Sequence, residues 1–248
     1  MIRLSNANKW FFKGSERQVH AIRELNLELS QNSYTVIVGS NGSGKSTLLN
    51  LIAGSLDLDS GSLSIDKVDQ SHYRQHQRSH FVSRVFQDPL MGTASDLTVL
   101  ENFRLASLRS RKKGITIGMD KDFKKKVQQC VSEIGLGLEN KLDQPIGTLS
   151  GGQRQALTLL MTIMDETKVL LMDEPASALD PATASVIMEL ANRITMQHRL
   201  TTILVTHNIK DALKYGDRII MMSNGKISHD VSGNEKNALK PADVLNWF

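Results

Sequence analysis

Gly39-Ser40-Asn41-Gly42-Ser43-Gly44-Lys45-Ser46-Thr47 is the stretch that decides the fold of this 248-residue chain. It fits the P-loop pattern G-x-x-x-x-G-K-[ST] at every fixed position. The apolar run Tyr34–Val38 before it predicts a buried parallel strand, and the run Thr47–Ala53 after it predicts a helix packed on a sheet. Strand, glycine-rich loop and helix are the context in which this pattern binds a nucleoside triphosphate.

The chemistry of phosphate binding explains the spacing of this loop. Its three glycines let the backbone curl so that successive N–H groups point at phosphate oxygens, and the helix N-terminus adds a positive dipole end. Lys45 is expected to reach the β- and γ-phosphates, and the Ser46 hydroxyl to ligate Mg²⁺. A chance match in a glycine-rich turn is the alternative. The predicted cofactor-binding residues of the loop are Gly39, Ser40, Asn41, Gly42, Ser43, Gly44, Lys45, Ser46 and Thr47.

The composition is that of an ordinary globular protein, with 40% hydrophobic and 23% charged residues. The net charge of +4 fits nucleic acid or an anionic membrane surface, but phosphate binding and scattered lysines explain it equally well. Cys130 is the single cysteine, which excludes an internal disulfide and favours a reducing compartment. The N-terminus lacks the apolar core of a signal peptide, and the longest apolar run, Ala156–Met164, is too short for a membrane span. Any link to a membrane is therefore expected to come through a partner.

Two acidic residues follow the apolar run Lys168–Met172, which predicts a buried strand. Asp173 is expected to hold Mg²⁺ at the end of this strand, and Glu174 is placed to polarise an attacking water. The alternative is that Asp173 and Glu174 are two surface acids after a strand. The presence of a P-loop in the same chain argues against this alternative. The predicted metal residues are Ser46, Gln87 and Asp173.

Gln87 and His207 also end apolar runs, Phe81–Phe86 and Thr201–Thr206. In parallel α/β sheets, ligand sites gather at the carboxyl ends of strands. A glutamine oxygen there can reach Mg²⁺ or orient water, and a histidine can donate to a γ-phosphate or relay a proton. The predicted catalytic residues are Glu174, His207 and Gln87.

Capping patterns predict three helix starts, at Thr98–Glu101, Ser150–Gln153 and Asp180-Pro181. The helix N-terminus at Ser150 can hold an anion, which predicts a second phosphate site. Between about residues 88 and 149 no clear strand occurs. We expect a helical subdomain there, with helices over 98–109 and 120–134 and a basic loop at Arg109–Gly114, inserted into an α/β core.

The remaining segments predict smaller features. Alternating apolar residues from Ile2 to Leu29 predict strands, and of the three aromatics Trp10-Phe11-Phe12 between them, Phe11 is expected to stack on adenine. Asn224-Gly225 predicts a hairpin turn. A polar, solvated helix rather than a metal site is predicted for the segment that carries His72, Arg74, His76, Arg78 and His80.

Taken in order, the P-loop, Gln87, Leu149–Gln153, Asp173-Glu174, Ser177–Asp180 and His207 resemble the ATP-binding-cassette (ABC) family nearly from end to end. The resemblance implies a P-loop NTPase (RecA-like) core with an N-terminal antiparallel β subdomain. The core would comprise residues 1–87 and 150–248, and the helical signature subdomain about 88–149, in one ABC ATPase domain.

The resemblance also implies a role for each matching residue. Phe11 would stack on adenine, Gln87 would contact Mg²⁺ and sense the transporter, Glu174 would be the general base and His207 the switch histidine. Asp180 lies in the D-loop. The signature residues Ser150, Gly151, Gly152 and Gln153 would close on the ATP of a second copy, so that two copies arranged head to tail form two complete sites.

The expected protein is thus an ATPase, with ATP and Mg²⁺ as cofactors, on the cytoplasmic face of a membrane. Its expected partners are a second copy, transmembrane permease subunits and an extracytoplasmic substrate-binding protein, with no nucleic acid. Segments 87–94, 11–14 and 206–208 look like ATPases of tryptophan/tyrosine import, although Pro175-Ala176-Ser177 departs from that group. One alternative is a soluble ABC ATPase acting on nucleic acid or ribosomes, and another is a regulatory nucleotide binder without turnover.

Overall fold

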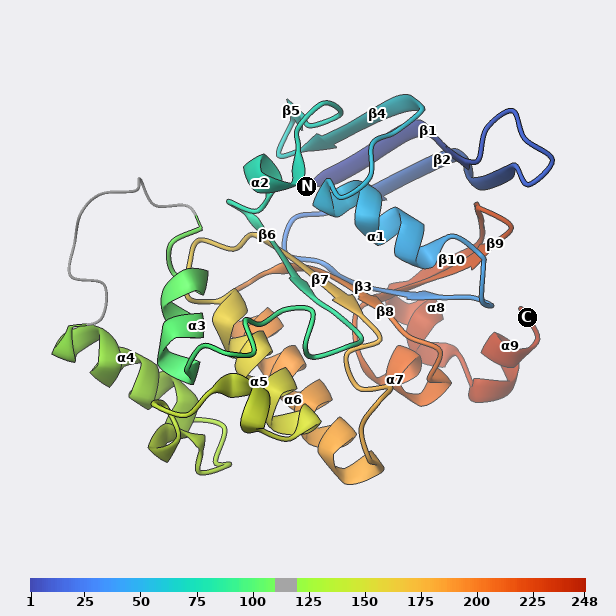
Figure 1. Ribbon diagram of the computed structural model, residues 1–248. Coiled ribbons are helices and arrows are strands. Elements are labelled where there is room, and N and C mark those ends of the chain that lie inside the picture. Colours follow the sequence, from blue (N-terminus) through green and yellow to red (C-terminus); the bar gives the residue numbers. More distant parts are fainter. Residues whose placement is uncertain (110–119) are drawn as a thin grey trace. The chain divides into compact units, whose positions relative to one another are not determined.

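The computed structural model describes residues 1–109 and 120–248, which form two compact units. The first unit comprises Met1–Arg78 and Arg199–Phe248, and the second comprises Ser79–His198 (Figure 1). Beyond Arg109, the predicted basic loop lies outside the described residues.

An antiparallel sheet forms one part of the first unit, as the resemblance implies. Its strand order is β2-β1-β4-β5. The strands are β1 (Ile2–Phe11), β2 (Val19–Leu29), β4 (Ser60–Ile65) and β5 (Val68–Asp69). The predicted apolar face of β2 is buried, at Ile22, Leu25, Leu27 and Leu29. The alternation skips one position at Glu24, whose φ of 49° coincides with a shift in the β1–β2 register.

A second set of strands in the first unit has the order β10-β9-β3-β8. β3 (Tyr34–Val38) runs parallel to both β8 (Thr201–Val205) and β9 (Arg218–Ser223), and every residue of β3 and β8 is buried. This confirms the two buried parallel strands. β9 and β10 (Lys226–Ser232) form the predicted hairpin, in which Asn224 and Gly225 both have positive φ, as a type I′ turn requires.

Five helices belong to the first unit. α1 (Lys45–Ala53) follows the P-loop and ends at Gly54 in the left-handed conformation. The others are α2 (Gln75–Arg78), α7 (Ile209–Lys214), α8 (Gly233–Ala238) and α9 (Pro241–Leu245).

The solvated helix predicted around α2 needs one correction. His72, His76 and His80 are exposed, and no cluster of metal-ligating side chains occurs among the described residues. Arg78, however, is only 1% exposed. Its guanidinium donates to the carbonyl oxygens of Leu51 and Ile52 at the end of α1 and, at 2.5 Å, to that of Gln70. A cation at the C-terminus of α1 adds donors for carbonyls of the last turn, which lack the N–H of a following helical turn.

The second unit combines two parallel strands with helices. β6 (Val82–Val85) pairs with β7 (Val169–Asp173). The helices are α3 (Val99–Ala106), α4 (Lys121–Ser132), α5 (Gly151–Thr162) and α6 (Pro181–Gln197), with 3₁₀ turns at Leu138–Asn140 and Ile146–Thr148. No strand lies among the described residues between β6 and β7, in keeping with the predicted helical insertion (Figure 1).

All three predicted helix starts are confirmed. Thr98 and Ser150 each form a capping box, and Asp180 accepts from the N–H of Thr183. α3 ends earlier than predicted, at Ala106, and Arg109 folds back so that its Nε donates to the Ala106 carbonyl. Across residues 1–109 and 120–248, no helix has the length and apolarity needed to cross a bilayer.

Two aromatic stacks occur in the first unit. Trp10 lies on His20 with ring centroids 3.5 Å apart, and Trp247 lies on His229 at 4.7 Å. Each of the two tryptophans of the chain therefore contacts an imidazole face to face.

Candidate nucleotide-binding and catalytic site

The P-loop takes its shape from glycines that no other residue could replace without strain. Gly39, Gly42 and Gly44 have φ values of 148°, 78° and 104°. A Cβ on Gly39 would lie 2.3 Å from the Met222 carbonyl oxygen, and one on Gly44 would lie 2.6 Å from that of Ala21. The loop is thus pressed against strands β2 and β9, and its path is fixed by backbone contact.

The ammonium group of Lys45 lies against the backbone of this loop. The side chain is 7% exposed, and its ammonium donates to the carbonyl oxygens of Gly39 (2.7 Å) and Ser40 (2.9 Å). Ser40, Asn41, Gly42 and Ser46 lie on the exposed side of the loop. An open, glycine-lined cradle with a lysine behind it fits a triphosphate, which needs N–H donors and a cation.

The structure places His207 beside the P-loop. β3 and β8 are neighbouring parallel strands with Ile37 opposite Val205, and the N–H of Thr206 donates to the Ile37 carbonyl. His207 and Gly39 therefore leave the same edge of the sheet, and His207 is exposed. This is the edge at which ligands bind in parallel sheets.

Phe11 ends β1 in the same unit and is partly exposed, while Phe12 is 69% exposed with a φ of 52°. The Trp10 ring is stacked on the His20 ring. The structure thus leaves Phe11 and Phe12 with accessible surface for an adenine.

The second unit brings Gln87, Asp173 and Glu174 to one edge. Val85 of β6 lies opposite Met172 of β7, so the two strands end together. Oxygen atoms of an amide and a carboxylate are ligands that Mg²⁺ prefers, and with so few protein ligands the ion would depend on phosphate oxygens and water. Glu174 has a φ of 47°, which is uncommon for a residue with a side chain.

Arg84 contacts Asp173 at this edge, and the sequence patterns did not indicate this contact. Its Nη2 lies 2.9 Å from Oδ2 of Asp173, and both side chains are about one-seventh exposed, at 13% and 14%. The guanidinium also lies over the Phe86 ring, 4.6 Å from its centroid. A charged residue on a strand otherwise made of apolar and small residues was the available signal.

The signature segment begins α5. Ser150 accepts from the N–H of Gln153, whose side chain accepts from the N–H of Ser150. A Cβ on Gly152 would lie 2.3 Å from the Thr183 side chain, so α5 and α6 meet at this glycine. Asp180 caps α6 three residues earlier, and its hydrogen bonds with Thr183 lower the pKa of its carboxyl. The structure therefore brings Asp180 and the signature residues to neighbouring helix starts.

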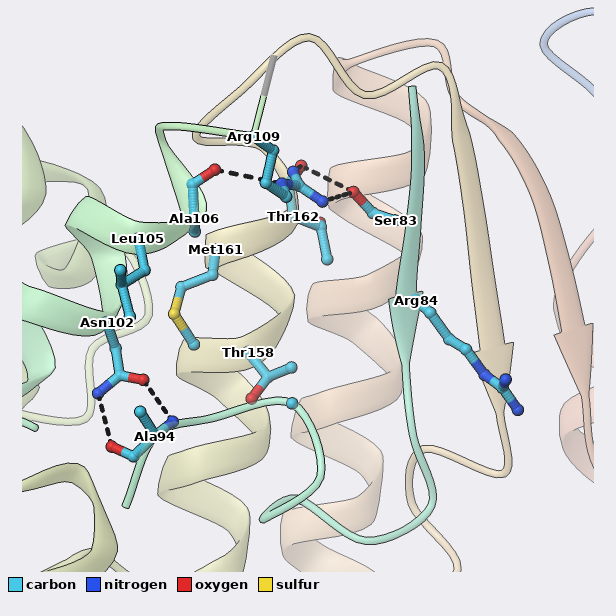
Figure 2. A pocket seen from close by; sticks show the side chains of 11 residues that line it. Ser83, Arg84, Ala94, Asn102, Leu105, Ala106, Arg109, Thr158, Met161 and Thr162 are labelled. Atoms are coloured by element: carbon cyan, nitrogen blue, oxygen red, sulfur yellow. Dashed lines mark hydrogen bonds between the residues drawn. The ribbon is translucent and has the colours of Figure 1, made fainter. Parts of the chain in front are cut away.

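A pocket of about 280 Å³ opens beside α3 and α5 in the second unit (Figure 2). Figure 2 shows Arg109 crossing its upper end, where the guanidinium donates to Ser83 on β6 (2.5 Å) and to the Thr162 carbonyl on α5 (3.1 Å). Arg84 extends away from the pocket. The lower part is closed by Asn102, whose side chain bonds both the N–H and the carbonyl of Ala94.

Comparison with known proteins gives consistent results. Residues 22–177 match the family model described as ABC transporter. The chain is 38% identical to a tyrosine transport ATP-binding protein of Clostridioides difficile, over 100% of this chain and 98% of that protein. It is 34% identical to the thiamine import ATP-binding protein ThiQ of Escherichia coli K12, over 87% and 88% of the two chains.

Among solved structures, the fold is similar to a dimeric ATP-binding cassette in a post-hydrolysis state bound to ADP and phosphate. The TM-score is 0.81 with 27% sequence identity, over 94% of this chain and 98% of that chain. The family model matches more than half of the chain, and a relative aligns over its full length, so the family of the protein is established. It belongs to the ABC transporter family and is an ATP-binding cassette that hydrolyses ATP.

Proposed function

We propose that this cassette powers the import of a small organic solute, such as an aromatic amino acid, as the ATPase subunit of a membrane transporter. The observation that carries the proposal is the 38% identity to a tyrosine transport ATP-binding protein over the full chain. The thiamine import relative supports import as the direction. Solute choice belongs to partner proteins, because a cassette is specialised for ATP.

The proposed roles follow the geometry of each unit. In the first unit, the P-loop and Lys45 hold the phosphates, Phe11 stacks on adenine and His207 reaches the γ-phosphate. In the second, Glu174 orients and deprotonates the attacking water. Ser46, Gln87 and Asp173 would hold Mg²⁺, which supplies positive charge for the phosphate oxygens. We also keep the division into an ATP-binding core, residues 1–87 and 150–248, and a helical subdomain, about 88–149, as a proposal.

The proposed working form is a pair of copies. Each chain carries one P-loop and one signature segment, Ser150–Gln153, and symmetric head-to-tail pairing would complete two sites. The exposed N-terminus of α5 offers N–H groups and a positive dipole end to a phosphate. The similar dimeric cassette with ADP and phosphate supports this arrangement.

The pocket of the second unit is the surface that we propose for a permease segment. Leu90, Met91 and Leu105 are 43%, 67% and 53% exposed, and Leu105 also lines the pocket. Apolar side chains exposed around a concave surface are typical of partner binding. The partner would hold the cassette at the cytoplasmic face of the membrane, and an extracytoplasmic binding protein would deliver the solute.

The test uses tagged Glu174→Gln protein expressed in its native cells, because loss of the general base should preserve the ATP-bound pair. Membranes are solubilised with ATP, the tag is captured, and co-purifying chains are identified by mass spectrometry. A stoichiometric multi-span permease supports the proposal, and an accompanying binding protein identifies the solute by its own ligand.

A matched variant locates the contact. Glu174→Gln combined with Leu105→Glu should keep ATP binding and lose the permease. Recovery of the cassette only from the soluble fraction, with ribosomal or DNA-bound chains, would contradict the proposal and support the nucleic-acid alternative.

A further inference from the structure

Gln155 is a buried polar residue that the roles above leave unused. It lies in α5, four residues after Gly151, and is 0% exposed, with Ala156 and Leu157 buried beside it. A buried amide is costly unless its polar atoms are hydrogen-bonded. Its contacts therefore reveal why a glutamine occupies this position.

One nitrogen atom of Gln155 donates hydrogen bonds to two segments that are distant in the sequence. Nε2 donates to the Phe86 carbonyl oxygen at 3.0 Å and to the Pro175 carbonyl oxygen at 2.8 Å. An amide nitrogen carries two N–H bonds, so each carbonyl receives one. The orientation of the amide is fixed, because the reversed amide would set Oε1 against both carbonyl oxygens. Oε1 itself is buried and accepts no hydrogen bond from the described residues.

The two carbonyls adjoin residues with proposed catalytic roles. Phe86 directly precedes Gln87, and Pro175 directly follows Glu174. Glu174 is held in the left-handed region, a conformation that costs on the order of 1–3 kcal/mol and persists only when its surroundings enforce it. On its C-terminal side, the N–H and hydroxyl of Ser177 donate to the Glu174 carbonyl. Gln155 holds the next carbonyl along.

We infer that Gln155 is a positioning residue that fixes Gln87 and Glu174 relative to each other and to the signature helix. A displacement of the first turns of α5 is thereby transmitted to both strand ends through a single amide. The inference rests on the roles proposed for Gln87 and Glu174. It adds to them a physical link between the helix that meets a second copy and the residues that act on the water and the metal.

The test compares Gln155→Met, which keeps the length of the side chain and removes both donors, with Ser107→Ala. Ser107 is 3% exposed, lies in the same unit at the end of α3 and donates to the Arg104 carbonyl at 2.8 Å. The control thus removes a buried hydrogen bond of this unit without touching either strand end. Hydrogen–deuterium exchange and ATPase kinetics are measured on both variants and on wild type.

Gln155→Met should speed exchange in the peptides that cover 86–92 and 174–179 and leave the rest of α5 protected. Its kcat should fall roughly 10- to 100-fold, because a misplacement of about 1 Å at a reacting group has that effect. KM for ATP should change little, since the P-loop is untouched. Ser107→Ala should show neither the local exchange nor the fall in kcat.

An even rise in exchange over residues 79–198, equal in the two variants, would overturn the inference and leave Gln155 a structural residue. If the Gln155→Met variant is recovered unfolded, the Gln155→Asn variant is used instead. The asparagine side chain keeps the amide but is shorter by one methylene, so the amide no longer reaches the two carbonyls. The same local exchange is then expected. The outcomes remain separate from the proposed function. A wild type without ATPase activity contradicts that proposal, while an active wild type with Gln155→Met equal to Ser107→Ala contradicts only the inference.

Discussion

The P-loop and the acidic end of β7 reach their shapes in different ways. The P-loop is shaped by its own backbone, with glycines at positive φ pressed against the carbonyls of Met222 and Ala21. The end of β7 is shaped by side chains from other elements, since Asp173 is bonded by Arg84 of β6 and Pro175 by Gln155 of α5. We therefore expect phosphate binding to depend on backbone geometry, and hydrolysis to depend on side chains that cross between elements.

The difference has a functional consequence. A loop fixed by backbone contacts keeps its shape when neighbouring side chains change, so ATP binding should survive most substitutions outside the loop. An edge held by single side-chain contacts can be displaced by one substitution. The two properties should therefore separate by mutation, with binding and turnover responding to different residues.

The largest separation is expected for Glu174→Gln. Loss of the proposed general base should lower kcat by roughly 10²- to 10⁴-fold, the usual contribution of such a group, while ATP affinity is retained. Phosphate release measures the first effect, and titration with a fluorescent ATP analogue measures the second. The variant should also accumulate as an ATP-bound pair, so a variant that stays monomeric in ATP and Mg²⁺ by light scattering would contradict the composite site.

Lys45→Ala should show the reverse pattern. The ammonium is expected to bond phosphate oxygens, and charge-assisted hydrogen bonds contribute about 1.5–3 kcal/mol, so the Kd for ATP should rise about 10- to 100-fold. Lys236→Ala is the control, because that buried lysine donates to the carbonyls of Leu213, Tyr215 and Gly216 and has no proposed contact with ATP. It should lower thermal stability and leave the Kd unchanged. Unchanged affinity in Lys45→Ala would contradict its role.

A smaller effect is expected for Arg84→Met. The guanidinium would compete with Mg²⁺ for Oδ2 of Asp173, so its removal should lower the Mg²⁺ concentration that gives half-maximal nucleotide binding. The pair is partly exposed, and such pairs contribute about 0.2–1 kcal/mol, which corresponds to a shift of about 1.4- to fivefold. Arg3→Met makes the same charge change at the exposed Arg3–Glu28 pair and should leave this concentration unchanged. A higher Mg²⁺ requirement would show that Arg84 orients Asp173 rather than competing for it.

The smallest effect compares two helix caps. Ser150→Ala and Asp120→Ala each remove an N-cap, and each should lower the free energy of unfolding by about 1 kcal/mol in urea titrations. Because α5 and not α4 carries the signature segment, only Ser150→Ala should also weaken pairing in ATP. Equal pairing in the two variants would argue against a phosphate contact at Ser150.

What could be predicted from the sequence is what depends on neighbouring residues. The strand–loop–helix geometry around the P-loop, the caps at Thr98, Ser150 and Asp180 and the turn at Asn224-Gly225 each involve residues a few positions apart. The structure shows all of these features. Contacts that join distant segments were missed. The Arg84–Asp173 pair spans 89 positions and the Gln155–Phe86 bond spans 69, so neither could be read before the strands were placed side by side.

The burial of Arg78 also depends on a contact between distant segments, and the sequence predicted its environment wrongly. Its polar neighbours predicted solvent exposure, yet it is buried because the end of α1, 26 residues earlier, needs donors for its carbonyls. A polar pattern predicts the average environment of a segment. It does not predict the single side chain that turns inward to satisfy a helix terminus.

The two indole–imidazole stacks give this protein an optical property. Because Trp10 lies on His20 and Trp247 on His229, the whole tryptophan emission comes from rings in contact with a group that quenches indole fluorescence more strongly when protonated. Burial, with Arg23 adding to it, lowers the pKa of His20 below 6.5. Emission from Trp10 should thus stay bright at neutral pH and dim only in more acidic solution. Trp10, the residue next to Phe11, is thereby a label-free reporter of events at the end of β1, where we propose that adenine binds.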